Sequence, residues 1–241
     1  TSSVGTYPIT LAGGSATNYS IILQSGVLTI NKAQLTVTAN NQSRVYGAAN
    51  PSLTFVYAGF VNGENASVID TPPVTSTSAT VLSGVGSYPI NVSGGSDNNY
   101  NLNYVSGTLT ITKKVLTATA VNASRTYGAA NPTFSITYTG FVNSEDASVI
   151  DVLPVASTTA TLTSSTGTYP ITVSGGTDNN YSFSFVSGTL TITKAILVAT
   201  VENASRQFGV ANPTFTISYT GFRNGETSAV LDNPPTASTS A

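Results

Sequence analysis

The sequence predicts an all-β protein built from tandem domains of 81 residues, and three observations support this. Landmark segments recur at a fixed spacing of 81 residues along the chain. Short segments alternate apolar residues with Thr and other polar residues, as half-buried strands do. Gly, Pro and Asn cluster between these segments, as they do in turns. We expect each domain to be a small β-sandwich or a β-grasp-like roll, and the domains to lie end to end.

Two landmarks define the repeat and its register. They are the aromatic-Gly turn at Tyr46-Gly47, Tyr127-Gly128 and Phe208-Gly209, and the segment Tyr7-Pro8-Ile9, Tyr88-Pro89-Ile90 and Tyr169-Pro170-Ile171. The spacing divides the chain into a second half of a repeat (1–32), two complete repeats (33–113 and 114–194) and a first half (195–241). Because the chain starts at Thr1 without an initiator Met or a signal peptide, we expect it to be cut from a longer protein.

The first half of the complete repeat 33–113 predicts two strands and one short helix. Residues 35–39 alternate Leu, Val and Ala with Thr, which indicates a strand, and residues 53–57 indicate a second one. Residues 46–51 form a turn, because Gly47 tolerates positive φ and Asn50 precedes Pro51. Residues 62–69 are expected to form one or two helical turns with Asn62 as the N-cap and Glu64 near the N-terminus.

The second half of the repeat predicts strands alone. Residues 79–82 and 88–92 are expected to be strands after the break at Pro72-Pro73, with a Gly/Asn-rich loop at 94–99. Residues 100–105 and 108–112 flank Ser106-Gly107, which predicts a hairpin.

The junction at Lys113-Lys114 contains no Pro-, Gly- or Ser-rich linker, so we expect neighbouring domains to keep a fairly fixed angle. Apolar residues occupy odd positions before the junction, as in Leu109 and Ile111, and even positions after it, as in Leu116 and Ala118. The buried face therefore switches there, which marks a domain boundary.

Composition excludes most chemical functions. Cys, His, Met and Trp are absent, which removes disulfides, Cys/His zinc sites, and thiol or imidazole chemistry. Only 7% of residues are charged and the formal net charge is −2, so no basic patch is available for nucleic acid. Hydrophobic residues make up 40% of the chain, enough for a core, but no apolar run approaches the roughly 20 residues that span a membrane. We expect no enzyme activity, no nucleic-acid partner and no membrane insertion in this segment.

The internal copies test each candidate site, because a chemical role in every repeat requires the same residue type at every equivalent position. Asp97 and Asp178 lie in a Gly/Asn-rich loop that offers oxygen ligands for calcium, but the equivalent residue in the first half-repeat is Ala16. A plain solvated loop is favoured over a calcium site. We therefore predict no catalytic, cofactor-binding or metal-binding residues.

Two acidic residues recur six positions apart, a spacing that superficially resembles a catalytic carboxylate pair. These pairs are Glu64 and Asp70, Glu145 and Asp151, and Glu226 and Asp232. A structural role is favoured, because the Glu suits a helix N-terminus and the Asp suits the turn that follows.

Recurring Arg and Tyr residues also suit internal roles. Arg44, Arg125 and Arg206 precede the aromatic-Gly turn, and we expect each to pair with a recurring acid or stack on a ring rather than hold a ligand carboxylate. Tyr46 becomes Phe208, and Tyr104 becomes Phe185 or Leu23, so these positions are expected in the core. Two positions keep Tyr in every copy and are expected to pin loops through their hydroxyls, with carbohydrate stacking as the alternative. They are Tyr88, with Tyr7 and Tyr169, and Tyr100, with Tyr19 and Tyr181.

Several segments of the repeat together resemble a known family. They are Lys32, residues 35–39, Arg44-Val45-Tyr46-Gly47, Asn50-Pro51, and residues 59–64, 86–90, 99–100 and 107–113. They look like the MBG-type repeat of the Tyr-Gly-X class, and the resemblance covers the whole chain, with modest departures at Ser144, Phe208 and Arg223. It implies long arrays in secreted or surface-anchored bacterial proteins, including adhesins of gliding Bacteroidota, and brings no catalytic residues.

Three functions stay open. The first is a mechanical stalk of an extracellular, cell-surface adhesin, whose partners are the neighbouring repeats of the same chain. The second is a repeated module that binds a glycan, a host or surface ligand, or a partner chain. The third is a self-assembling fibre, in which half-repeats of different copies complete each other by strand complementation.

Overall fold

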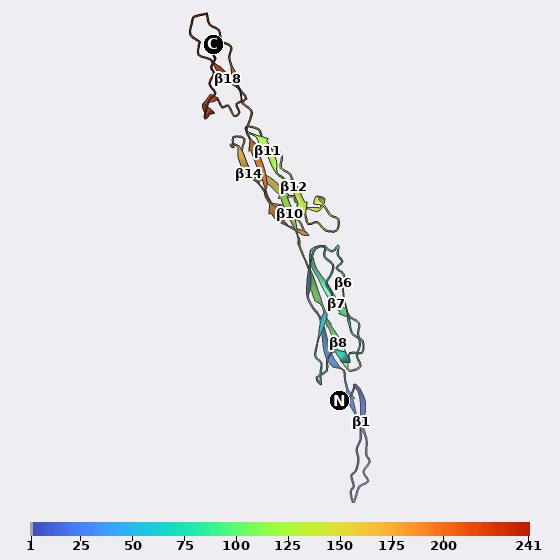
Figure 1. Ribbon diagram of the computed structural model, residues 1–241. Helices are drawn as coiled ribbons and strands as arrows, with labels where there is room; N and C mark the ends of the chain where they lie inside the picture. The colour runs from blue at the N-terminus through green and yellow to red at the C-terminus, as the bar shows by residue number, and fades with distance from the viewer. Residues whose placement is uncertain (1) are drawn as a thin grey trace. The chain divides into compact units, whose positions relative to one another are not determined.

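The computed structural model describes residues 2–241, which form two compact units that divide after residue 114 (Figure 1). The chain is almost entirely β, as the sequence predicts. The elements of the first complete repeat are β3 (Ala33–Ala39), β4 (Gln42–Val45), β5 (Phe55–Ala58), η1 (Ala66–Val68), β6 (Val74–Thr77), β7 (Gly86–Ser93), β8 (Tyr100–Val105) and β9 (Gly107–Thr112). Those of the second are β10 (Lys114–Ala120), β11 (Ala123–Thr126), β12 (Ile136–Thr139), η2 (Ala147–Val149), β13 (Val155–Thr158), β14 (Gly167–Ser174), β15 (Tyr181–Val186) and β16 (Gly188–Thr193).

Each complete repeat is a sandwich of two sheets. In the first repeat a three-stranded sheet has the order β5-β3-β8, and a four-stranded sheet has the order β4-β9-β7-β6. The second repeat has the same two orders, β12-β10-β15 and β11-β16-β14-β13. Of the two architectures that the sequence left open, the two-sheet sandwich is therefore the one adopted, and the β-grasp-like roll is not.

Two parallel pairings join the first half of a repeat to its second half. Strand β3 pairs with β8 from Ala33↔Tyr100 onward, and β4 pairs with β9 from Gln42↔Leu109 onward. The third connection between the halves is antiparallel, between β6 and β7. Within the halves, β3 pairs with β5 and β7 pairs with β9, both antiparallel. A repeat is thus closed by pairings between segments far apart in sequence.

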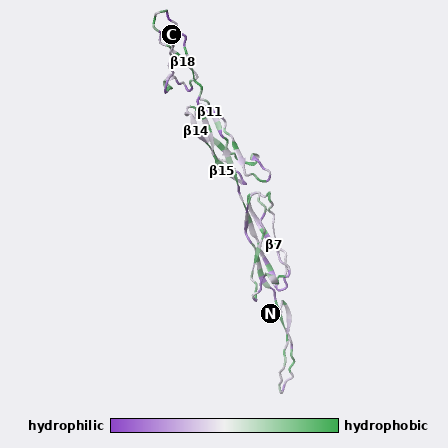
Figure 2. Cartoon of the chain, viewed as in Figure 1, coloured by the Kyte–Doolittle hydropathy of each residue, from purple (hydrophilic) through white to green (hydrophobic). Residues whose placement is uncertain are grey.

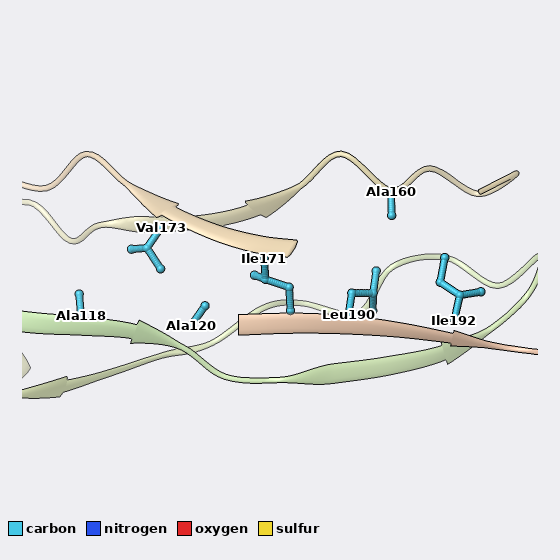
Figure 3. Packing of buried hydrophobic residues seen from close by; sticks show 7 residues of the cluster. All are labelled: Ala118, Ala120, Ala160, Ile171, Val173, Leu190 and Ile192. Atoms are coloured by element: carbon cyan, nitrogen blue, oxygen red, sulfur yellow. The ribbon is translucent and has the colours of Figure 1, made fainter. Parts of the chain in front are cut away.

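The core lies between the two sheets and comes from the alternating apolar positions. In the second repeat, Ala118 and Ala120 of β10 face Ile171 and Val173 of β14, and Leu190 and Ile192 of β16 extend the same cluster (Figure 3). Burying one such Leu or Ile side chain contributes about 1.5–3 kcal/mol. The equivalent residues of the first repeat are also buried, so each complete repeat makes its own core.

The expected hairpin at Ser106-Gly107 is wrong. Strands β8 and β9 follow one another directly, but they belong to different sheets, so Ser106 is a crossing from one sheet to the other. Gly107 allows this crossing because it lies against the backbone of Ala39, where an added Cβ would stand 2.6 Å from the carbonyl oxygen. The close approach, and not a tight turn, is what requires glycine here.

Three further expectations need correction. Residues 62–69 contain only the single 3₁₀ turn η1, whose N-cap is Asn65 and not Asn62. Asn62 instead has a φ of 58° in the preceding turn.

Residues 79–82 are not a strand, because Arg44 and Asn50 bind the carbonyls of Thr80 and Ala79 and a turn follows. The strand expected at 53–57 starts at Phe55, and β4 and β6 were not predicted.

The terminal half-repeats keep only the pairings that lie within a half. The first one forms β1 (Gly5–Ile9) and β2 (Gly26–Ile30), the counterparts of β7 and β9. The last one forms β17 (Val198–Val201), β18 (Ile217–Thr220) and the 3₁₀ turn η3 (Ser228–Val230), the counterparts of β3, β5 and η1. Hydrophobic residues occur along these terminal segments as they do in the complete repeats (Figure 2).

Candidate functional site

The aromatic-Gly turn is held by a buried arginine. The Arg44 guanidinium donates from Nε to Asn50 Oδ1 at 2.8 Å and from Nη2 to the Thr80 carbonyl at 2.5 Å. Asn50 Nδ2 in turn donates to the Ala79 carbonyl at 2.6 Å. The arginine therefore ties its own strand to the loop that follows β6. The internal role is the expected one, but the partners are neutral oxygens instead of the acid or ring that we predicted.

The same network recurs in the second repeat. Arg125 donates to Asn131 Oδ1 at 2.7 Å and to the Thr161 carbonyl at 2.5 Å, and Asn131 donates to the Ala160 carbonyl. Arg206 of the last half-repeat keeps its bond to Asn212 but is exposed. Bonds to a charged donor contribute about 1.5–3 kcal/mol when the group is buried, so this network stabilises complete repeats most.

A tyrosine and a glutamate join the start of β8 to the loop before η1. The Tyr100 hydroxyl donates to Glu64 Oε2 at 2.5 Å and accepts from the Val61 amide at 3.0 Å. Its ring meets Phe60 edge to face, with centroids 5.5 Å apart. Glu64 thus binds a tyrosine, and our prediction that it sits at a helix N-terminus is wrong. The pinning role predicted for the tyrosine hydroxyl is confirmed.

The Asp97 side chain holds the loop before β8 in place through hydrogen bonds. Its Oδ1 accepts from the amides of Asn99 and Tyr100 at 2.7 and 2.9 Å, and the side chain is buried. Asp70 Oδ2 accepts from the Asn98 amide at 2.9 Å. Glu64 and Asp70 therefore bind different groups and do not act as a pair. Within residues 2–241, no group of three or more Asp, Glu, His or Cys side chains is placed to hold a metal.

The other invariant tyrosine lies within a strand, β7 in the first repeat, and ties that strand to the loop that precedes it. The hydroxyl of Tyr88 donates to the Gly84 carbonyl at 3.0 Å, and those of Tyr169 and Tyr7 donate to Ser165 and Ser3 in the same way. Tyr104 differs from its prediction, because it is 40% exposed and not in the core. It lies near the end of β8, where the last three residues of the strand are exposed.

A contact across a repeat junction lies in residues 115–241. The Tyr127 hydroxyl, in the aromatic-Gly turn of the second complete repeat, donates to Glu226 Oε1 at 2.5 Å in the repeat that follows. Beside it, Gly128 has a φ of 75° and lies against the Arg223 side chain, which an added Cβ would meet at 2.4 Å. Glycine is required both for the backbone angle and for the space.

The hydrogen bond to the Glu226 carboxylate raises the pKa of the Tyr127 phenol, with a smaller contribution from burial. The bond to Glu64 raises the pKa of Tyr100 for the same reason. A negative acceptor beside the oxygen disfavours a second negative charge, so both phenols stay protonated and donate. These hydroxyls act as hydrogen-bond donors and are not suited to be nucleophiles near neutral pH.

A second junction contact lies in residues 2–114. Lys32, the last residue of the first half-repeat, donates from Nζ to the Asp97 carbonyl at 2.7 Å. The Val4 amide donates to Asn99 Oδ1 at 3.0 Å. Both partners lie in the loop before β8. The loop that the Asp97 side chain holds in place therefore also binds the preceding half-repeat.

Sequence reasoning missed the roles of Lys32, Asn50 and the Tyr127–Glu226 pair. The available signal was recurrence, because Lys, Asn and Glu occupy the same place in every copy. Recurrence alone does not show which residues meet across a junction. No helix in the described part of the chain is long and apolar enough to cross a membrane.

The fold and these contacts define an array of β-sandwich repeats whose recurrent polar residues bind other parts of the array. The chain belongs to the MBG domain (YGX type) family, which it matches over residues 1–29, 35–110, 116–191 and 197–241. No curated protein matches the chain significantly. The family is one of non-enzymatic repeat domains of large extracellular proteins.

Proposed function

We propose that these repeats form the structural stalk of a bacterial surface adhesin, which holds a distal adhesive region away from the cell during attachment or gliding. The observation that carries this proposal is the bond from Tyr127 to Glu226, which ties one repeat to the next. No flexible linker separates those repeats in the sequence. Such an array serves to hold the adhesive region at a distance from the cell.

Two further observations support a stalk. Each complete repeat closes its own core, so repeats are added without changing one another's interior. The recurrent Arg, Tyr and Asp side chains bind groups of their own repeat, and Tyr127 binds the next repeat. Such contacts maintain the shape of the array and require no ligand. A chain without Cys also avoids unwanted cross-links in an oxidising extracellular space.

The test is small-angle scattering with analytical ultracentrifugation on arrays of two, four and eight complete repeats, each starting at the residue equivalent to Ala33. Such arrays contain no half-repeat, so each unit has its own core. We expect the maximum dimension to grow in proportion to the number of repeats while the mass stays that of one chain.

The matched control carries a Gly/Ser linker of about ten residues between Lys113 and Lys114 at each junction. A flexible chain grows only as about the square root of its length, so this array should show sublinear growth. If the unmodified arrays behave like the control, the stalk is ruled out.

The second candidate function is binding, and one groove favours it. A cavity of about 550 Å³ opens in the second repeat between the edge strands β12 and β13, lined by Phe134, Tyr138 and Val155 among others. In the first repeat Thr75 Oγ1 donates to the Leu53 carbonyl across the equivalent edges, and Ala156 removes this bond in the second. Saturable glycan binding by the chain, lost in Tyr138→Ala, would favour this function.

A further inference from the structure

The second complete repeat contains an apolar groove between its two sheets, along the edge strands β12 and β13. The groove measures about 550 Å³, and its lining includes Phe134, Ile136 and Tyr138 on the side of β12 and Leu153 and Val155 on the side of β13. None of the described residues that line it is charged. All of them belong to one complete repeat, so the groove is a feature of the repeat itself.

The equivalent edges of the first repeat are tied together. Thr75 Oγ1, on β6, donates to the Leu53 carbonyl at 3.2 Å and so links the edge of one sheet to the segment before β5. Ala156 replaces Thr75 in the second repeat, and a methyl group cannot make this bond. Leu153 replaces Pro72 and is 53% exposed. The same pair of edges therefore occurs in a linked form and in an open, more apolar form.

The backbone of β12 presents hydrogen-bonding groups at the open edge of its sheet. The Val121 amide donates to the Ser135 carbonyl at 2.9 Å, and β10 and β12 continue from there as an antiparallel pair. Bonded pairs alternate along such a ladder, so every second residue of β12 bonds to β10. Ile136 and Tyr138 are the residues between, and their amides and carbonyls point away from β10. Their side chains line the groove.

β12 lacks the features that usually protect an edge strand. Protected edges carry Lys or Pro, or a bulge, that prevents another strand from adding. The sequence of β12 is Ile-Thr-Tyr-Thr, and its register with β10 is continuous over residues 136–139. On the other side of the groove, Pro154 directly precedes β13 and has no amide proton to donate. Addition of a strand is therefore favoured at β12 over β13.

We propose that β12 binds an extended, uncharged segment of another protein, which adds to its open edge as a further strand. Apolar side chains at alternate positions of the segment enter the groove beside Phe134 and Tyr138. The polar side chains between them face water beside Thr137 and Thr139, which are exposed. A charged side chain is excluded from the groove, because the lining offers it no partner. In recognition of this kind, backbone bonds give affinity and pockets for alternate side chains give specificity.

This proposal rests on the binding function of the groove and gives it a ligand class, a peptide strand instead of a glycan. Recognition of a sugar requires several polar groups that bind its hydroxyls. Among the described residues that line the groove, only Thr133 and Tyr138 have polar side chains. The proposal is independent of the stalk, because an array whose length grows in proportion to its repeats can still bind a segment at each open groove.

The experiment measures, by fluorescence anisotropy, the binding of the whole chain to a labelled, capped seven-residue peptide of alternating Thr and Val. One form of the peptide is N-methylated at its Val residues, and another at its Thr residues. Only every second amide of an added strand faces β12. One N-methylated form should therefore bind about tenfold more weakly, while the other binds like the parent peptide.

Ala156→Thr is the protein variant, because it restores the side chain that Thr75 provides in the first repeat. Its hydroxyl should tie β13 to the Phe134 carbonyl and weaken peptide binding by about tenfold or more. Ser157→Thr is the matched control. It adds a methyl group to an exposed side chain of the same strand, so binding should stay unchanged.

Failure of the parent peptide to bind, equal effects of the two N-methylations, or unchanged binding to Ala156→Thr each overturn the proposal. Saturable binding of a glycan that the parent peptide does not displace would also overturn it, and would favour the glycan as the ligand of the groove.

Discussion

The hydroxyl of Tyr127 lies 2.5 Å from Oε1 of Glu226, which is 99 residues further along the chain. One repeat is 81 residues, so this bond joins the aromatic-Gly turn of one repeat to the Asn-Gly-Glu loop of the next. The two most characteristic segments of the repeat are therefore partners across a junction. The bond gives these two recurrent segments a structural role at this junction.

Glu226→Gln should lower the pKa of Tyr127. The raised pKa means that the folded chain holds this proton more tightly than the unfolded chain does, so the contribution to stability is complete below about pH 10 and is lost as pH rises through the folded pKa. A neutral Gln removes the charge that causes the shift. Ultraviolet titration of phenolate should show one tyrosine ionising at lower pH in the variant.

The control for this titration is Tyr127→Phe, a change that the chain itself carries at Phe208. In that background Glu226→Gln should leave the remaining phenolate curve unchanged. A shift of the same size in both backgrounds would mean that another tyrosine responds to Glu226.

Gly107→Ala should destabilise the first repeat by about 1–3 kcal/mol, because the new methyl would stand 2.6 Å from the Ala39 carbonyl oxygen. Gly26→Ala is the matched change in the first half-repeat. There the nearest atom is Ile9 Cβ at 3.7 Å, so the effect should stay within about 0.5 kcal/mol. Urea unfolding at low chain concentration measures both, and equal losses would contradict the sheet-crossing role of Gly107.

Arg44→Ala should cost about 2–4 kcal/mol, because it removes a buried guanidinium that donates hydrogen bonds to the side-chain oxygen of Asn50 and the carbonyl of Thr80. Arg206→Ala removes the equivalent but exposed side chain and should change stability by less than about 0.5 kcal/mol. Denaturant unfolding of the two variants compares them. If Arg206→Ala lowers the free energy of unfolding as much as Arg44→Ala does, the burial of Arg44 is not the reason that its network stabilises the repeat.

Asp146→Asn should make the second repeat less sensitive to acid. Hydrogen bonds from Ser148 lower the pKa of Asp146, so its contribution is present above the ordinary pKa and is lost as pH falls through the folded pKa. Asn caps the equivalent turn in the first repeat, where Asn65 accepts from the Ser67 amide. Unfolding curves between pH 7 and pH 2 should differ only at the acid end. A loss at pH 7 as well would show that Asn does not replace the cap here.

The elements that sequence predicted well are those with an apolar buried face. Strand β3 was expected because Leu35, Val37 and Ala39 point into the core. Strand β4 was missed because the residue on its buried face is Arg44. An arginine is charged, so the alternation of apolar and polar residues that predicts a strand is absent there. Strand β6 was missed for a related reason, since Thr75 and Thr77 are its less exposed residues and Val74 faces outward.

Pairing was harder to predict than the strands themselves. Strands β8 and β9 are neighbours in sequence, which favours a hairpin locally, but each finds a better partner in the first half of the repeat. The partners of the polar side chains were equally hard to predict from the sequence. The sequence indicated that Arg44 and Tyr100 act internally, but Asn50 and Glu64 became their partners only through the packing of distant loops.

The parallel pairs β3–β8 and β4–β9 determine how a complete repeat responds to pulling. Its first strands lie beside its last ones and run in the same direction, with evenly spaced hydrogen bonds. Tension applied to the two ends loads these bonds in shear, so they must break together instead of opening one at a time as in a zipper. We therefore expect a repeat built this way to resist rupture under tension by its strand order, without any covalent cross-link.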